Sequence, residues 1–328
     1  MPRLQPDVAA VRSAVRGSLS DVQAPALVLV GLSGGADSLA LCVAVSFVAP
    51  RAGLRWGAVV VDHGLQPGSA AIAQAAAAQA GSLGADVVEV MSVAVGGNGG
   101  PEAAARDARR AALLEAAERT GAAAVLLGHT LDDQAETVLL GLARGSGARS
   151  LAGMRARDGI WRRPLLGIEA TRTRAVCAHL GLDCWDDPHN ADLAYARVRV
   201  RRQLMPELER HLGPGVGAAL ARTADLLRDD ADLLDRLATD LLGAARAADG
   251  SLDVGSLAEA PAALRTRALR SAALSAGCPP TDLAAAHVHG LDRLITAWHG
   301  QSWVDLPGDV VARRVAGAIH LRRRDMAG

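Results

Sequence analysis

The stretch "VLVGLSGGADSLAL" (Val28–Leu41) indicates the fold of this chain. Apolar residues typical of a buried strand precede a turn at Gly34 and Gly35, and an apolar helical pattern resumes at Ser38. A strand, a glycine turn and a helix start in this order present backbone N–H groups at a helix N-terminus, where phosphate groups bind. The stretch therefore predicts a phosphate-binding loop at one edge of an α/β sheet.

Two common kinds of phosphate loop are excluded by the sequence. The dinucleotide pattern G-x-G-x-x-G is absent here, and all 35 residues counted as Lys or Arg are arginine. Without lysine the chain has neither a Walker A lysine nor the amine of a Schiff-base enzyme. An ordinary N-cap followed by a glycine turn is the alternative interpretation of Ser33–Ser38. Asp37 favours a nucleotide site, because a carboxylate beside bound phosphates is explained if Mg²⁺ bridges the two.

The alternation of strand and helix continues to residue 145. We expect strands at 26–33, 56–63, 85–93 and 123–130, with helices at 38–49, 69–83, 101–121 and 131–145. Near-continuous apolar strands separated by helices predict a doubly wound parallel sheet that is covered on both faces. The ligand of such an α/β domain is expected at the carboxyl ends of the strands. A short amphipathic helix within residues 1–24 precedes the sheet.

Beyond residue 145 the alternation stops. Residues 146–212 contain arginine-rich loops and two expected helices, at 169–181 and 194–211. We expect a catalytic domain over 1–212, which includes this extension, and a smaller, mainly helical C-terminal domain over 213–328. The stretch "HLGPGVG" (His211–Gly217) is the predicted linker between them. Further helices are expected near 217–248, 260–276 and 281–299, followed by two short strands around Pro307-Gly308.

Composition narrows the class of protein. Half of the residues are hydrophobic and the formal net charge is zero, so the chain is globular and has no overall basic field. Four cysteines occur without a C-x-x-C pair, which argues against a disulfide scaffold and a four-thiolate metal site. No apolar run approaches the roughly 20 residues that span a bilayer, and no signal peptide is evident. We expect a cytoplasmic protein with no membrane association.

Polar side chains follow the second and fourth expected strands. Asp62 and His63 end the second strand, where the base of a bound nucleotide would lie. A polar loop after a strand is the alternative interpretation.

The fourth strand leads into "GHTLDDQAETVLLGLARGSG" (Gly128–Gly147). Thr130 and Asp133 form a capping pair, but capping alone does not explain His129, Asp132 and Glu136 as well. His129, Asp133 and Glu136 follow i, i+4, i+7 spacing and so share one helix face. A His/Asp metal site is a weaker alternative, because the third ligand of a zinc motif is missing.

These motifs resemble a known family. The sequence S-G-G-x-D-S (Ser33–Ser38) resembles the pyrophosphate loop of the ATP pyrophosphatase superfamily. The motifs "DHGL", "EAAARDARRAAL", "GH-x-x-DDQAETVLL-x-L-x-RGSG", "RPLL", "DDP-x-N" and "Y-x-R-x-R-x-R" are similar to those of tRNA(Ile)-lysidine synthetase and cover about Val28–Pro206. The stretch "VDLPGDV…GAIHLRR" resembles the extra domain of that family more weakly. The resemblance implies an N-type ATP pyrophosphatase with a Rossmann-like sheet.

The resemblance also implies a reaction. ATP would activate the C2 carbonyl oxygen of the wobble cytidine in a tRNA(Ile) with a CAU anticodon, and free L-lysine would attack C2 through its ε-amine to give lysidine, AMP and pyrophosphate. Asp133 and Glu136 would bind the lysine ammonium, and they, His129 and Asp37 are the expected catalytic residues. ATP and Mg²⁺ are the expected cofactors, with Asp37 on the metal, and a homodimer is left open. The expected ATP-binding residues are Ser33, Gly34, Gly35, Ala36, Asp37, Ser38, Asp62 and His63.

Arginine clusters indicate the tRNA contacts. Eight arginines lie from Arg144 to Arg174, against two acids, and four more follow between Arg197 and Arg202. Such clusters favour phosphate contacts, although a solvated helix face is the better interpretation for any single arginine. An anticodon base would stack on arginine, or on Trp161 or Trp185. The expected tRNA-binding residues are Arg144, Arg149, Arg163, Arg197 and Arg201, and the C-terminal domain over 213–328 is expected to bind tRNA as well.

The chain departs from the family pattern at four positions. Gln66 replaces the usual Arg, Arg110 a Tyr, His189 a Ser and Val198 an Asn. We expect Gln66 and Val198 to affect tRNA contacts and to leave the ATP site intact.

Three other functions have less support in the sequence. A tRNA pyrimidine-2 sulfurtransferase generally needs paired cysteines, and the spacing of Cys177 and Cys184 is not of that kind. An amidotransferase-type synthetase lacks support, because no glutaminase domain is visible. Asp37 and the acids after the fourth strand speak against a non-catalytic nucleotide- or tRNA-binding protein.

Overall fold

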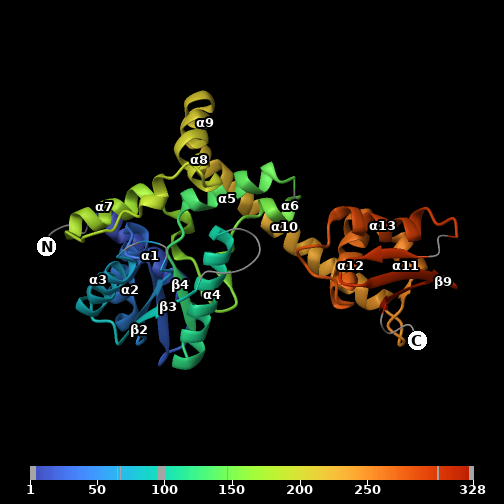
Figure 1. Cartoon of the computed structure of the whole chain (residues 1–328), viewed down its shortest axis with the longest axis horizontal. Coiled ribbons are helices and arrows are strands. Elements are labelled where there is room, and N and C mark those ends of the chain that lie inside the picture. The colour runs from blue at the N-terminus through green and yellow to red at the C-terminus, as the bar shows by residue number, and fades with distance from the viewer. Residues whose placement is uncertain are drawn as a thin grey trace. The chain divides into compact units, whose positions relative to one another are not determined.

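The protein folds into two compact units, Met1–Asp225 and Leu226–Gly328 (Figure 1). The computed structural model describes residues 5–64, 66, 68–94, 101–145, 147–300 and 303–324. Leu65 and Ser146, which belong to two of the motifs above, lie outside these residues. The division falls within the helix α10 (Val216–Ala245). The domain boundary at 212/213 stays a prediction, because a division by contacts does not measure which part folds alone.

The first unit is built on a six-stranded sheet in the order β3-β2-β1-β4-β6-β5. Strands β1 to β4 and β6 run parallel, and β5 pairs antiparallel with β6. The expected doubly wound parallel sheet is confirmed, and its strand order reverses between β1 and β4, where such folds bind ligands. The hairpin β5–β6 was not predicted, because two-residue strands carry no periodicity. The strand bounds are β1 Leu27–Leu32, β2 Arg55–Asp62, β3 Val87–Ser92, β4 Ala124–Leu127, β5 Arg157–Asp158 and β6 Trp161–Arg162.

Helices cover both faces of this sheet. Val28, Leu29 and Val30 of β1 are all fully buried, which explains why the strand reads as a continuous apolar run. One core packs helices α1, α2, α3 and α7 against the sheet, and a second packs α4 against the other face. The helix bounds are α1 Pro6–Ser18, α2 Ala36–Arg51, α3 Ser69–Ser82, α4 Pro101–Thr120, α5 Leu131–Ala143 and α7 Ala170–Leu180.

The arginine-rich extension is a series of short turns and helices. The helix expected at 194–211 is interrupted by a π-helical turn, which holds Arg201. Single π-turns inside helices are rare and are often found at functional sites. The elements are α6 Ala148–Leu151, η1 Pro164–Gly167, η2 Pro188–Ala191, α8 Ala196–Arg199, the π-turn η3 Val200–Leu204 and α9 Met205–Leu212.

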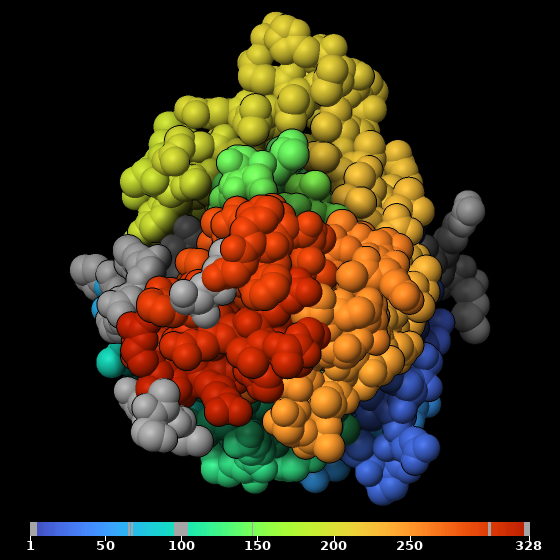
Figure 2. Space-filling view, turned by 90° about the vertical axis from the view of Figure 1, so that its right-hand side faces the viewer, coloured from blue at the N-terminus to red at the C-terminus, as the bar shows by residue number. Residues whose placement is uncertain are grey.

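The second unit packs helices on a four-stranded antiparallel sheet in the order β7-β10-β9-β8. The two strands expected around Pro307-Gly308 are confirmed as β8 and β9, while β7 and β10 are additional. Figure 2 shows the helical segment in orange beside the red C-terminal segment. None of the described helices could cross a membrane. The bounds are β7 Leu252–Asp253, α11 Val254–Glu259, α12 Ala262–Ser275, α13 Ala285–Thr296, β8 Val304–Leu306, β9 Val310–Val315 and β10 Ala318–Arg323.

Candidate active site

The loop between β1 and α2 has the geometry of an anion site. Gly34 has φ +80°, a left-handed conformation that favours glycine. The Ser38 hydroxyl accepts from the Ser33 N–H at 3.1 Å and donates to the Gly35 carbonyl at 2.9 Å, so it braces the turn. Gly35 occupies the N-cap of α2, and no side chain of the described residues caps this helix. The first N–H groups of α2 are therefore directed at the loop, on the positive end of the helix dipole.

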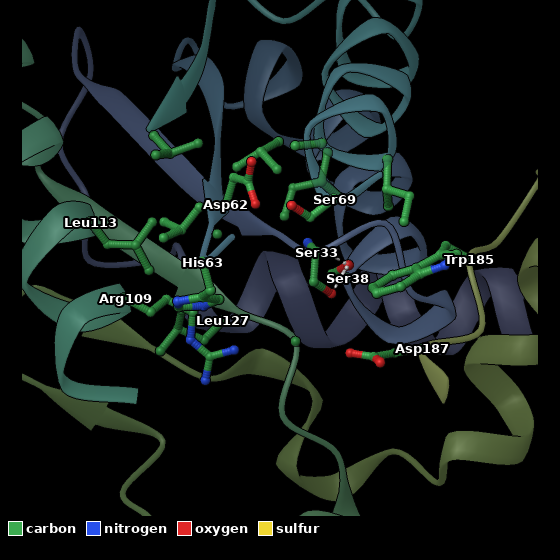
Figure 3. Close-up of a pocket in the computed structure, with 18 of the residues that line it drawn as sticks. Ser33, Ser38, Asp62, His63, Ser69, Arg109, Leu113, Leu127, Trp185 and Asp187 are labelled. Carbon is green, nitrogen blue, oxygen red and sulfur yellow. Dashed lines mark hydrogen bonds between the residues drawn. The ribbon is translucent and has the colours of Figure 1, made fainter. Parts of the chain in front are cut away.

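A cavity of about 310 Å³ lies beside this loop, at the carboxyl ends of β1, β2 and β4 (Figure 3). The Nδ1 atoms of His63 and His129 are buried there without a hydrogen-bond partner in the described part of the chain. Buried polar atoms are almost always satisfied, so these two nitrogens fit a site that a nucleotide completes. Of the predicted ATP-binding residues, Gly34, Gly35 and Ala36 belong to the loop but do not line the cavity. The predicted residues that line the cavity are Ser33, Asp37, Ser38, Asp62, His63 and His129.

Asp37 lies in the first turn of α2 and lines the cavity. Its carboxylate accepts a hydrogen bond from the Thr173 hydroxyl, and burial raises its pKa. Within the described residues no group of three His, Cys, Asp or Glu side chains could hold a metal on its own. One carboxylate beside a phosphate loop nevertheless fits Mg²⁺, which is held by one or two carboxylates together with substrate phosphates.

Helix α5 begins with a capping box. The Asp133 carboxylate accepts the Thr130 N–H at 2.8 Å, and the Thr130 hydroxyl faces the Asp133 N–H. The capping interpretation of this pair is therefore confirmed. Glu136 follows one turn later with 1% of its side chain exposed. Neither acid lines the cavity, whereas His129, one turn before Asp133, does.

Two arginines from the extension neutralise these acids. Arg201 contacts Asp133 Oδ1 through Nη2 at 3.0 Å and Glu136 Oε1 through Nε at 2.5 Å. Arg197 Nε lies 3.2 Å from the other Glu136 oxygen. The sequence predicted that the acids bind lysine and that the arginines bind tRNA, and the structure brings all four together. We call Asp133, Glu136, Arg197 and Arg201 the acid–arginine cluster.

Burial shifts the titration of this region. It lowers the pKa of His129 to about 3, so the ring is neutral at neutral pH and is a weak base. It also raises the pKa of Glu136, although Arg201 acts in the opposite direction. For Asp133, burial works to raise the pKa, but the hydrogen bond from the Thr130 N–H and the charge of Arg201 outweigh it and lower the pKa below the usual 3.8. The surroundings thus shift the pKa values of Asp133 and Glu136 in opposite directions.

The other expected tRNA contacts are not equally accessible. Arg144 and Arg149 are exposed at the end of α5 and on α6. Arg163 is only 5% exposed and donates from Nη1 to the Arg155 carbonyl at 2.8 Å. Trp161 is likewise buried, at 5%, so a base cannot stack on it from solvent. Of the two tryptophans considered for stacking, Trp185 is the one that lines the cavity.

Sequence reasoning missed several residues of the cavity. Asp187 Oδ1 accepts from Gln66 Nε2 at 2.8 Å and from the His189 N–H at 2.9 Å, and Gln66 also contacts the His189 ring. Gln66 and His189, two of the departures from the family pattern, therefore meet on the Asp187 carboxylate at the cavity. Their joint occurrence in the sequence could have indicated that they are neighbours. Arg109 of α4 also lines the cavity.

The remaining two departures lie away from it. The Arg110 guanidinium lies 4.5 Å from the centroid of the Trp161 ring and 3.6 Å from Asp158. Val198 is 9% exposed, so it contributes to packing and not to a surface contact with tRNA.

Cys177 and Cys184 are neighbours in space despite their spacing. The Cys177 thiol donates to the Ala36 carbonyl at 3.3 Å. Burial raises the pKa of Cys177 to about 12, so it is a thiol at neutral pH. A thiolate is the form that carries sulfur or binds metal, and this environment opposes it.

Both units of the chain match known protein domains. Residues 10–208 match the model of the PP-loop domain, which fits the loop, the sheet order and the cavity. The protein is thus a PP-loop enzyme that uses ATP. Residues 252–320 match the TilS substrate binding domain. The tRNA(Ile)-lysidine synthase of Thermobifida fusca is 57% identical over 96% of this chain and 97% of its own length. The tRNA(Ile)-lysidine synthase of Streptomyces coelicolor is 56% identical over 90% of this chain and 85% of its own length. The chain belongs to the tRNA(Ile)-lysidine synthase family.

A solved structure supports the fold. The U34-tRNA thiolase NcsA from Methanococcus maripaludis with its [4Fe-4S] cluster aligns with TM-score 0.56 and 20% identity, over 68% of this chain and 80% of that one. At this identity the likeness concerns the fold alone.

Proposed function

We propose that this enzyme joins free L-lysine to C2 of the wobble cytidine in a tRNA(Ile) with a CAU anticodon, at the expense of ATP. One observation carries the proposal. The segment from Gly128 to Glu136 is continuous. It places His129 in the cavity and the two acids of the acid–arginine cluster one to two helical turns further on. A nucleotide site and a cation site thus share one short element.

The first half-reaction adenylates the cytidine. The loop N–H groups and the start of α2 hold the phosphates of ATP, and Asp62 and His63 border the base. Asp37 would hold Mg²⁺, which would neutralise charge on the departing pyrophosphate. The bond between the α- and β-phosphates breaks as the C2 oxygen attacks, and AMP becomes attached to cytidine.

The second half-reaction attaches lysine. Its ammonium takes the position of the Arg201 guanidinium on Asp133 and Glu136, which already bind a cation. A lysine amine with a reference pKa near 10.4 must lose a proton before it attacks C2. Glu136, whose pKa burial raises, is the better proton acceptor of the two acids. The new C2–N bond forms as the C2–O bond to AMP breaks.

The tRNA contacts come from arginines and from the C-terminal domain. Arg144, Arg149, Arg197 and Arg201 are proposed to contact phosphates, with Arg201 leaving the acids as tRNA arrives. Arg163 contributes only if it becomes exposed. We further propose a catalytic domain over 1–212, a tRNA-binding domain over 213–328 and a cytoplasmic location, and light scattering would test for a homodimer.

Nucleoside mass spectrometry tests the reaction. A CAU tRNA(Ile) transcript is incubated with protein, ATP and Mg²⁺, with lysine in one reaction and a sulfur donor in another. A lysine-dependent cytidine adduct is expected, and it should disappear with Asp37→Ala while tRNA binding persists. Sulfur incorporation would instead identify a thiolating enzyme, and binding without either product would contradict catalysis.

A further inference from the structure

The sheet of the second unit has one packed face and one open face. Leu306, Ala312 and Ile319 point into the core, where each is at most 6% exposed. Side chains alternate along a strand, so the neighbours of these residues point the other way. The register pairs His320 with Arg313 and Arg322 with Val311 on that side. We call this the outer sheet face; its residues are Asp253, Trp303, Asp305, Val311, Arg313, Val315, Ala318, His320 and Arg322.

An exposed tryptophan is fixed on this face. Trp303 directly precedes β8 and is 48% exposed. Its indole N–H donates to Asp305 Oδ2 at 3.2 Å, and the Arg313 guanidinium lies 5.4 Å from the ring centroid. An exposed, oriented indole beside arginine is the arrangement on which nucleic-acid bases stack.

The charges on this face favour a polyanion. Arg313 and Arg322 have no carboxylate partner among residues 226–300 and 303–324. The two acids of the face are engaged elsewhere, Asp305 by Arg324 and Asp253 by the Ser256 N–H at 2.6 Å. The aliphatic side chains that accompany them on the described face are Val311, Val315 and Ala318, which give little apolar area for a protein partner. Arginine at this density fits phosphates, which it can contact with two N–H groups at once.

We propose that the outer sheet face binds tRNA. Arg313 and Arg322 contact backbone phosphates, and an unpaired base stacks on Trp303. The inference rests on the proposed function and deepens it, since the match to a substrate binding domain over 252–320 names no surface.

Binding of CAU tRNA(Ile) to the full chain tests the inference. Trp303→Ala should weaken binding roughly 5- to 150-fold, which is the range for the loss of one stacked base. Arg313→Ala combined with Arg322→Ala should weaken it about tenfold or more and lower the salt dependence by about one unit of slope for each phosphate contact. The control is Arg293→Ala, which removes an exposed charge from α13, the helix that packs on the inner side of the sheet.

Three outcomes separate the hypotheses. If the wild type forms lysidine and the variants bind tRNA less tightly with unchanged ATP binding, the inference holds. If the wild type forms lysidine and these variants bind like Arg293→Ala, the outer sheet face is not the tRNA surface. If the wild type forms no lysidine, the proposed function fails, whereas the binding comparison still decides the inference. Arg313→Glu repeats the test with a larger expected loss should Trp303→Ala fail to fold.

Discussion

Removal of Arg201 should strengthen lysine binding to the free enzyme. Arg201 makes three contacts with the two carboxylates to which we assign the lysine ammonium. In the wild type, lysine must displace this guanidinium before it can bind. In Arg201→Ala the displacement costs nothing, so the measured dissociation constant approaches its intrinsic value.

The size of the effect follows from the contacts. A hydrogen bond to a charged group contributes about 1.5–3 kcal/mol. The Arg201 side chain is 37% exposed, so solvent screening reduces this value. A net competition of about 1–2 kcal/mol remains, which corresponds to lysine binding that is roughly 5- to 30-fold tighter.

Calorimetric titration of lysine into tRNA-free protein provides the assay. Arg202→Ala is the matched control, because Arg202 is the exposed neighbour and the structure gives it no contact with Asp133 or Glu136. Its lysine affinity should equal that of the wild type. If Arg201→Ala binds lysine as well as the wild type does, or more weakly, Arg201 does not compete with lysine for the two carboxylates. The same variant should bind tRNA more weakly.

Three further predictions follow from the site. Asp133→Asn should lower the free energy of unfolding by about 1–3 kcal/mol at pH 7. Because the pKa of Asp133 is lowered in the folded protein, this stabilisation is present above the usual pKa of 3.8 and disappears as the pH falls. The melting temperatures of the variant and the wild type should therefore converge below pH 3.8. Gly128→Ala places a Cβ 3.1 Å from backbone atoms at the start of α2, so ATP binding and melting temperature should both fall in calorimetry, by an overpacking cost of about 1–3 kcal/mol. Gly167→Ala is the control, because a Cβ added at this position has no atom within 4 Å. It should change neither ATP binding nor the melting temperature. Asp187→Ala removes the acceptor shared by the Gln66 amide and the His189 backbone N–H at the cavity, and it should raise the KM for ATP several-fold in a pyrophosphate-release assay. An equal effect of Asp186→Ala would contradict a specific role.

Local features of this fold could be predicted from the sequence, and long-range pairings could not. The strand β1, its glycine turn and the capping box of α5 follow from residues within a few positions of each other. The pairing of Glu136 with Arg201 joins residues 65 apart, and sequence patterns carry no information about which cation meets which acid. The burial of Arg163 was not predicted either. An arginine in a basic segment is ordinarily solvated, and the contacts that bury this one are not visible in the local sequence. The cavity residue Asp187 appeared only as part of a motif, without a partner.

The continuous element from His129 to Glu136 has a thermodynamic consequence. One end of it borders the nucleotide cavity and the other holds the cation site, so a displacement caused by one ligand would reach the other through the first turns of α5. Binding of ATP and of lysine should then be linked, and linkage is reciprocal. Whatever factor ATP contributes to lysine affinity, lysine must contribute to ATP affinity. The enzyme would thereby sense the supply of an amino acid through its hold on a nucleotide.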